Sequence, residues 1–181
     1  APAVMMPQLS GAFALDALGA AALAGLFYYG YSPFSLIAGA ALDRFGPRAV
    51  LPAAAALTGA GALLFASGTL PLAQLGRFLQ GAGGVFSLVG AVYIASRNFP
   101  ASRAGTLIGA TQMFGMAGGS AGQFVVGPLI AGGLAWSTFW AGMGTAGIAL
   151  GVLLFLLLPR SEEPPSAASS HNWLKTSLSA M

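Results

Sequence analysis

Residues 39–48 read Gly-Ala-Ala-Leu-Asp-Arg-Phe-Gly-Pro-Arg, and this short charged stretch separates two long apolar runs. The run before it, 17–42, contains no charged residue, and neither does the run after it, 49–76. A helix of about 20 apolar residues is long enough to cross the hydrocarbon core of a bilayer. The stretch is therefore interpreted as a tight turn between two membrane-spanning helices.

The composition of the whole chain also favours a lipid environment. Of its 181 residues, 56% are hydrophobic and only 6% are charged, whereas soluble domains carry about a quarter charged residues. The mean hydropathy is +0.80. The 27 glycines are typical of membrane helices, where small residues allow the backbones to approach closely. We therefore expect the lipid bilayer to surround this chain.

Charge and cysteine content exclude several other classes of protein. The net charge is +3, but the basic residues lie between apolar runs and form no clustered basic face, so nucleic acid is not an expected partner. The chain has no cysteine, which excludes disulfides, Cys-based zinc sites and Cys nucleophiles. We expect no cofactor and no metal site.

The uncharged runs predict an all-α, polytopic transmembrane bundle. Residues 1–6 are expected to be the outer stub of an earlier helix, followed by a loop up to residue 15. Residues 159–172 form a polar, Pro/Ser-rich segment that predicts a cytoplasmic linker, and 173–181 would begin another segment. The chain does not start with Met and stops abruptly, so we expect truncation at both ends. The five complete spans are predicted at 17–42, 49–69, 72–97, 104–132 and 135–158.

The basic residues predict the orientation of these spans. The loops 69–72 and 132–136 contain no Lys or Arg. The other loops would therefore face the cytoplasm by the positive-inside rule. Arg77, inside a predicted span, is the exception. Six of the seven basic residues fall in these alternate loops or after the last span: Arg44, Arg48, Arg97, Arg103, Arg160 and Lys175.

The 39–48 turn resembles the signature loop between helices 2 and 3 of the major facilitator superfamily. That loop has a Gly, an Asp-Arg-x-Gly core and closing basic residues; Pro47 here replaces a position that is often basic. A plain basic turn that closes a helical hairpin is the alternative interpretation. The matching residues are Gly39, Asp43, Arg44, Gly46 and Arg48.

Asp43 would lie at the cytoplasmic end of a helix, where the helix dipole disfavours an anion. It should therefore have a cationic partner, and Arg97, at the cytoplasmic end of the 72–97 span, is the best candidate. The resemblance implies that this loop latches the two halves of a transporter and opens as the carrier changes state. We hypothesise that an Asp43–Arg97 pair has that role.

A second stretch, Arg-Phe-Leu-Gln-Gly-Ala-Gly at 77–83, resembles the Arg-x-x-x-Gly-x-Gly motif of helix 4 in the same superfamily. Arg77 would lie about 8 Å inside the outer boundary, where a charge is costly and usually faces a water-filled cavity. Gln80 is one turn away on the same face. The alternative is that Arg77 extends to the outer headgroups and has no role in transport.

Helical spacing adds four candidates for a substrate cavity. Tyr28 and Tyr31 share a face of the 17–42 span, and Gln112 and Gln123 share a face of the 104–132 span. The tyrosines could instead be packing or interface aromatics, and the amides could bond to a neighbouring helix. The same spacing rule suggests close helix packing at Gly115-xxx-Gly119, Gly118-xxx-Gly122 and Gly147-xxx-Gly151.

The resemblance covers nearly all of the chain and implies the N-terminal six-helix half of the fold, with its first helix truncated. The missing C-terminal half of the same transporter is then an expected partner, and solute would bind between the halves by alternating access. Residues 27–31, followed by 43–48, look like bacterial permeases for organic anions and sugar phosphates. That likeness implies the bacterial inner membrane.

Charge gives one indication of the solute. Between residues 17 and 158 only Asp43 is acidic, and Arg77 is the only charge inside a span. A small organic anion therefore fits better than a cation, and proton coupling stays open because no buried carboxylate is visible. The chain has no His-Glu-x-x-His motif and no pair of acidic residues within a span, so we do not expect an enzyme. A channel or receptor, and a truncated or half-size module that needs a partner half, are the alternatives to a transporter.

Overall fold

The structure is a computed structural model that describes residues 2–158, and within that range it contains helices and no strand. The predicted all-α fold is therefore confirmed. A short 3-10 helix, η1, precedes six α-helices. Their bounds are Pro2–Met5 for η1, Met6–Phe13 for α1, Ala17–Phe45 for α2, Pro47–Ala66 for α3, Leu70–Asn98 for α4, Ala101–Ala131 for α5 and Trp136–Leu157 for α6.

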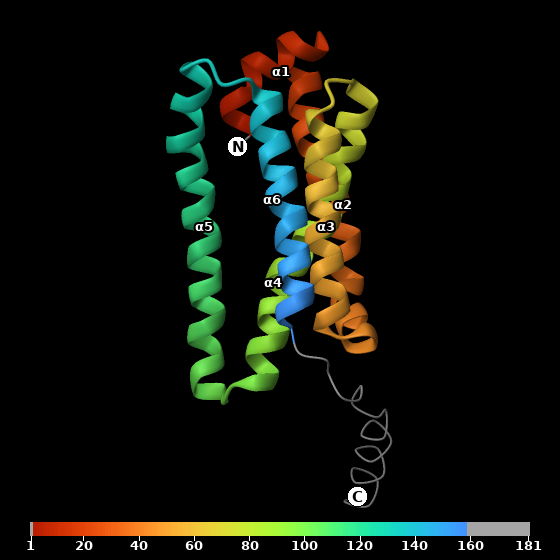
Figure 1. Ribbon diagram of the computed structural model, residues 1–181, viewed down its shortest axis with the longest axis vertical. Helices are drawn as coiled ribbons and strands as arrows, with labels where there is room; N and C mark the ends of the chain where they lie inside the picture. The colour runs from red at the N-terminus through yellow and green to blue at the C-terminus, as the bar shows by residue number, and fades with distance from the viewer. Residues whose placement is uncertain (1, 159–181) are drawn as a thin grey trace, which may run out of the picture.

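The long helices run up and down, so that their turns alternate between the two ends of the bundle (Figure 1). Among the described residues, α3, α4, α5 and α6 are each long and apolar enough to cross a membrane. The pair α1 and α2 passes the same test as one bent unit with an angle of 107°, which brings the number of candidate spans to five. The predictions for 159–172 and 173–181 lie outside the described residues.

Local sequence accounts for two of the turns. The carboxylate of Asp16 accepts a hydrogen bond of 2.7 Å from the backbone N–H of Gly19, which caps the start of α2. Gly46 alone separates α2 from α3, and its φ of 74° with ψ of 160° lies in a region that only glycine adopts without strain. Pro47 then begins α3 with a φ that already suits a helix.

Glycines set the distance between the packed helices. At the α2–α4 crossing, a Cβ on Gly81 would overlap the carbonyl oxygen of Phe27. At the α3–α6 crossing, a Cβ on Gly59 would lie 2.7 Å from the carbonyl oxygen of Gly144. Side chains larger than hydrogen would therefore push these backbones apart, as expected where small residues provide the helix contact. Gly147 and Gly151 of α6 also approach α3 closely.

Helix α5 is packed differently from the others. It stands beside the bundle and joins it mainly through its two ends (Figure 1). Most of its side chains are exposed, including Met116 and Phe124. The expected close packing at Gly115, Gly118, Gly119 and Gly122 is absent within the described residues, because nothing lies within 4 Å of the Cβ positions of these glycines.

The N-terminal residues differ from the expected stub and exit loop. Residues 6–13 form α1, and Pro7 lies in its first turn, where proline is tolerated. Met5 and Leu9 are fully buried against an outer cluster that includes Phe65 and Trp140. The prediction of a loop is wrong for these residues because burial of this apolar face outweighs the turn preference of Ser10 and Gly11.

Candidate functional site

Arg77 is buried inside the bundle, in the third turn of α4 and about 10 Å from the start of that helix. Its side chain is 7% exposed. One guanidinium nitrogen donates a hydrogen bond of 2.6 Å to the amide oxygen of Gln80, and another donates one of 3.2 Å to the backbone carbonyl of Ala24. The side chain is thus held from α4 and from α2, and it does not extend to the outer surface.

Three aromatic rings surround the charged group. The central carbon of the Arg77 guanidinium lies 5.3 Å from the ring centroid of Phe27, 5.8 Å from that of Phe65 and 5.9 Å from that of Trp140. These rings come from α2, α3 and α6, so every packed helix contributes to the surroundings of Arg77. Rings at such distances attract a cation, but none of them neutralises its charge.

No carboxylate balances Arg77 within residues 2–158. The two acidic residues in that range are Asp16, which caps α2, and Asp43, which pairs with Arg97 at the other end of the bundle. A buried cation whose partners are only a neutral amide, a carbonyl and ring faces is costly. The arrangement is suited to receive an anion.

Three nitrogen donors in this region have no hydrogen-bond partner in the described part of the chain. They are Nε of Arg77, Nε2 of Gln80 and Nε1 of Trp140. Gln80 and Trp140 are 4% and 8% exposed. Both residues line a hollow of about 270 Å³ between α3, α4 and α6, whose walls are apolar, while the three nitrogen atoms themselves are buried.

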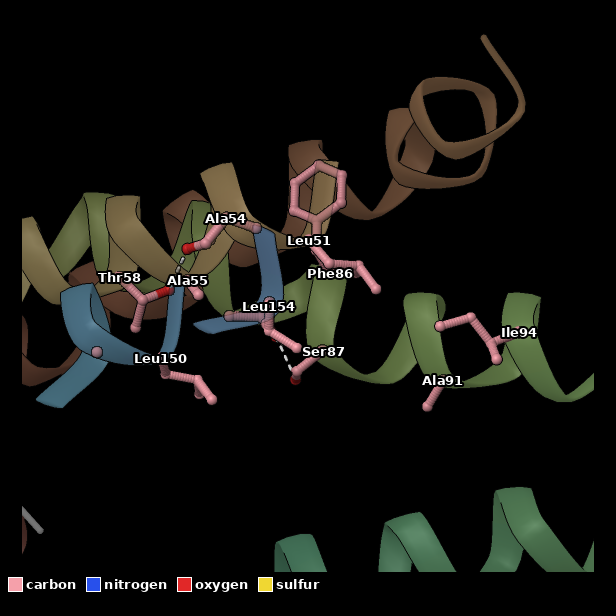
Figure 2. A pocket seen from close by; sticks show the side chains of 13 residues that line it. Leu51, Ala54, Ala55, Thr58, Phe86, Ser87, Ala91, Ile94, Leu150 and Leu154 are labelled. Atoms are coloured by element: carbon pink, nitrogen blue, oxygen red, sulfur yellow. Dashed lines mark hydrogen bonds between the residues drawn. The ribbon is translucent and has the colours of Figure 1, made fainter. Parts of the chain in front are cut away.

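A second hollow of about 430 Å³ continues from the first toward the end of the bundle where α2 meets α3. The two hollows share Thr58, Gly147 and Leu150. Figure 2 shows that the second hollow is lined by small and apolar side chains from α3, α4 and α6, such as Ala54 and Leu154. Together they make an almost wholly apolar groove, and its few polar side chains, among them Thr58, Gln80 and Ser87, are spread along its length.

The other predicted cavity residues are not gathered around Arg77. Tyr31 is half-buried and stacks on Phe27 with ring centroids 5.8 Å apart, so it touches the site through that ring. Tyr28 is 72% exposed and meets Phe27 edge-on. Gln112 and Gln123 are exposed on α5, away from the Arg77 cluster.

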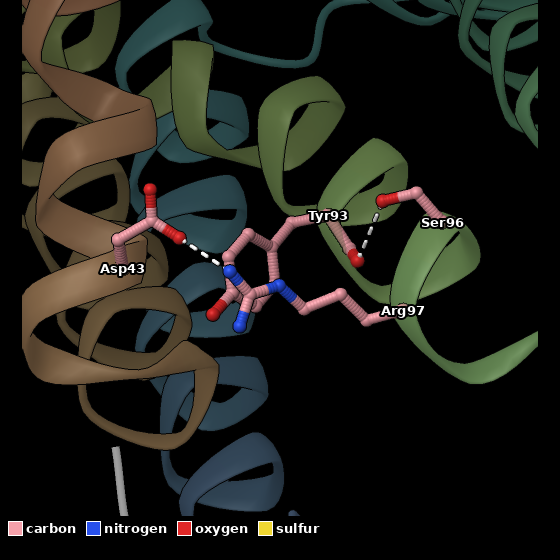
Figure 3. Close-up of polar contacts among 4 residues, drawn as sticks. All are labelled: Asp43, Tyr93, Ser96 and Arg97. Carbon is pink, nitrogen blue, oxygen red and sulfur yellow. Dashed lines mark hydrogen bonds and ion pairs between the residues drawn. The ribbon is translucent and has the colours of Figure 1, made fainter. Parts of the chain in front are cut away.

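At the opposite end of the bundle, Asp43 and Arg97 form an ion pair. A guanidinium nitrogen of Arg97 lies 2.8 Å from a carboxylate oxygen of Asp43 and donates a hydrogen bond to it. The ring centroid of Tyr93 lies 4.4 Å from the Arg97 guanidinium, so the side chain rests on that ring (Figure 3). The pair joins the C-terminal ends of α2 and α4.

The remaining residues of the 39–48 loop lie around this pair without joining it. Gly39 lies within α2 with open space beside it, and Gly46 forms the turn itself. Arg44 is exposed and lies over the neighbouring Phe45 ring. Arg48 reaches the ring of Phe155 on α6, 5.4 Å from its centroid. The loop therefore contacts both α4 and α6 at one end of the bundle.

Sequence reasoning missed several residues of the Arg77 site. Phe27, Phe65 and Trp140 are ordinary apolar positions in a chain where 56% of residues are hydrophobic, and nothing in their spacing links them to Arg77. Trp140 is the only one with a chemical signal, because an indole N–H in a membrane helix needs a hydrogen-bond acceptor.

Comparison with protein families matches residues 1–179 to the Major Facilitator Superfamily. The match covers nearly the whole chain and includes both the 39–48 loop and the 77–83 stretch. No curated protein and no solved structure matches the chain.

Proposed function

The chain belongs to the Major Facilitator Superfamily, and we propose that it acts within a secondary active transporter that carries a small organic anion by alternating access. The family consists of membrane transporters, which accounts for the apolar helices. The nature of the solute and the mode of transport are the proposed part.

The buried charge of Arg77 is the observation that carries the proposal. Its guanidinium has no carboxylate partner in the described range and keeps an unused donor. An anionic solute that binds there would complete the charge and the hydrogen bonds together, which an uncharged or cationic solute cannot do. Coupling to protons is compatible with this site but is not required by it.

The inner end of the bundle supplies the proposed conformational latch. Arg44, Arg48, Arg97 and Arg103 all lie there, which is why we assign that end to the cytoplasm. The Asp43–Arg97 pair would hold one arrangement of the helices and open when the carrier changes state. A bacterial inner membrane, and likeness to organic-anion and sugar-phosphate permeases, are part of the same proposal.

A second candidate is a truncated or half-size module that needs a partner half and does not transport alone. The exposure of almost the whole of α5, including Gln112 and Gln123, favours it. Amide side chains on a membrane helix require hydrogen-bond partners. In this candidate a partner half would cover them.

Counterflow in proteoliposomes tests the proposal and separates the candidates. Vesicles with the full-length protein are loaded with an unlabelled organic anion, and a trace of the labelled anion is added outside. A carrier gives transient accumulation of label that saturates with concentration. A channel gives only equilibration, and a module without transport gives neither. Absence of counterflow for all organic anions, with counterflow of a neutral solute, would refute the anion assignment.

A further inference from the structure

Trp140 on α6 has a hydrogen-bond donor that has no role in the proposed binding of an anion by Arg77. Its Nε1 is buried, 8% of the residue is exposed, and no acceptor in the described residues meets it. A buried indole N–H usually has a partner. In a membrane, where water does not satisfy it, an unpaired donor is costly.

The Trp140 ring lies close to the two other residues that have unused donors. The Arg77 guanidinium carbon is 5.9 Å from the Trp140 ring centroid, and Arg77 is hydrogen-bonded to Gln80 at 2.6 Å. Gln80 and Trp140 border the same hollow of about 270 Å³. Three residues of α4 and α6 with buried, unused donors are thus neighbours, and one of them is a cation.

Resting on the proposed transport of an anion, the geometry points to a three-donor site in which Arg77, Gln80 and Trp140 bind one oxyanion group of the solute. Trp140 is assigned here as a direct ligand and as a determinant of specificity. All three residues offer only N–H groups, because the amide oxygen of Gln80 already accepts from Arg77. The site accordingly selects a group rich in acceptors, such as a carboxylate or phosphate.

The surroundings explain why one compact oxyanion group fits better than a diffuse polar solute. The rings of Phe27, Phe65 and Trp140 exclude water around the guanidinium and hold it in place. In such an environment a charge-assisted hydrogen bond is stronger than in water. The adjoining groove is apolar, with Thr58 shared by both hollows, so it offers few partners for further polar groups.

Removal of the indole N–H tests this assignment. Calorimetric titration of the full-length protein in detergent with acetate, benzoate and glycerol 3-phosphate, at constant ionic strength, gives their affinities, and glycerol is the neutral reference. Trp140→Phe keeps an aromatic face over Arg77 but deletes the donor. Since hydrogen bonds to charged groups are strong, we expect the anions that bind the wild type to bind about tenfold more weakly.

Trp136→Phe is the matched control, because Trp136 is one turn earlier on α6 and is not among the residues with an unused donor. It should leave the anion affinities unchanged. If Trp140→Phe fails to fold, benzothienylalanine at position 140, in which sulfur replaces the ring N–H, retains the shape and makes the same test.

The outcomes separate this inference from the proposed function. Unchanged anion affinity in either Trp140 variant overturns the role of Trp140, whereas anion counterflow would still support the transporter. Absence of anion binding to the wild type, with counterflow of a neutral solute, overturns both. It would mean that another part of the protein supplies the acceptor for these donors.

Discussion

The guanidinium of Arg97 lies 2.8 Å from the carboxylate of Asp43, although 54 positions separate the two residues in sequence. Their side chains are 44% and 60% exposed. An exposed pair of this kind contributes about 0–1 kcal/mol, since water and salt screen it. A contact this weak can hold one arrangement of α2 and α4 and still break in every transport cycle.

We expect Asp43→Asn to shift the conformational equilibrium of the transporter and to slow transport, because Arg97 loses its ionic partner. The equilibrium should change by about fivefold at most, given the small free energy of an exposed pair. A cysteine introduced at Ser96, beside Arg97 in Figure 3, reports this change through its rate of labelling by a membrane-impermeant thiol reagent.

Asp16→Asn is the matched control for this substitution. Asparagine is also a good N-cap, so the capping hydrogen bond to Gly19 is retained in kind. The cysteine at position 96 should be labelled at the same rate in Asp16→Asn as in the protein with Asp16. If Asp43→Asn had the same labelling rate and the same transport rate as the parent protein, the Asp43–Arg97 pair would have no part in the conformational change.

The turn between α2 and α3 should not tolerate a side chain at Gly46. Its φ of 74° and ψ of 160° strain any other residue, so Gly46→Ala is expected to lower the free energy of unfolding by about 1–3 kcal/mol. Thermal unfolding in detergent measures this. Gly39→Ala, in open space within α2, should be neutral or slightly stabilising. Equal destabilisation by both would argue against strain at the turn.

Close approach of α2 and α4 depends on Gly81. In Gly81→Ala the new methyl group would overlap the backbone of Phe27, and overpacking of this kind costs about 1–3 kcal/mol of stability. The Phe27 ring would move with its backbone, so the position of Arg77 should change as well. Thermal unfolding and anion titration of the same sample measure both effects.

Gly84→Ala provides the comparison for this helix, because its Cβ would lie 3.4 Å from the Phe27 ring, an ordinary contact. We expect no loss of stability there. If Gly81→Ala were as stable as Gly84→Ala, the packing of α2 against α4 would not depend on glycine at position 81.

Much of the fold follows from the sequence because lipid imposes simple rules. Long uncharged runs must form helices to satisfy their backbone groups, and charges such as Arg44 and Arg103 lie where the chain leaves the apolar layer. The pairing of Asp43 with Arg97 could be anticipated because each is the charged residue at the same end of its helix. The roles assigned to these residues remain proposals.

The details that depend on tertiary packing could not be predicted in this way. Residues 6–13 contain turn-forming residues, but burial of Leu9 keeps them helical. The glycines of α5 resemble those of α6 in spacing, yet only the latter meet another described helix. Trp140 approaches Arg77 because α4 and α6 both pack against α3, and no local pattern encodes that arrangement.

The most direct test of anion recognition at Arg77 is counterflow of labelled organic anions by Arg77→Lys, with exposed Arg103→Lys as the control. Lysine keeps the charge but cannot donate to Gln80 and Ala24 together from one planar group. We predict at least a tenfold loss of anion counterflow in Arg77→Lys and none in Arg103→Lys. Full counterflow of every tested anion by Arg77→Lys would contradict the proposed site.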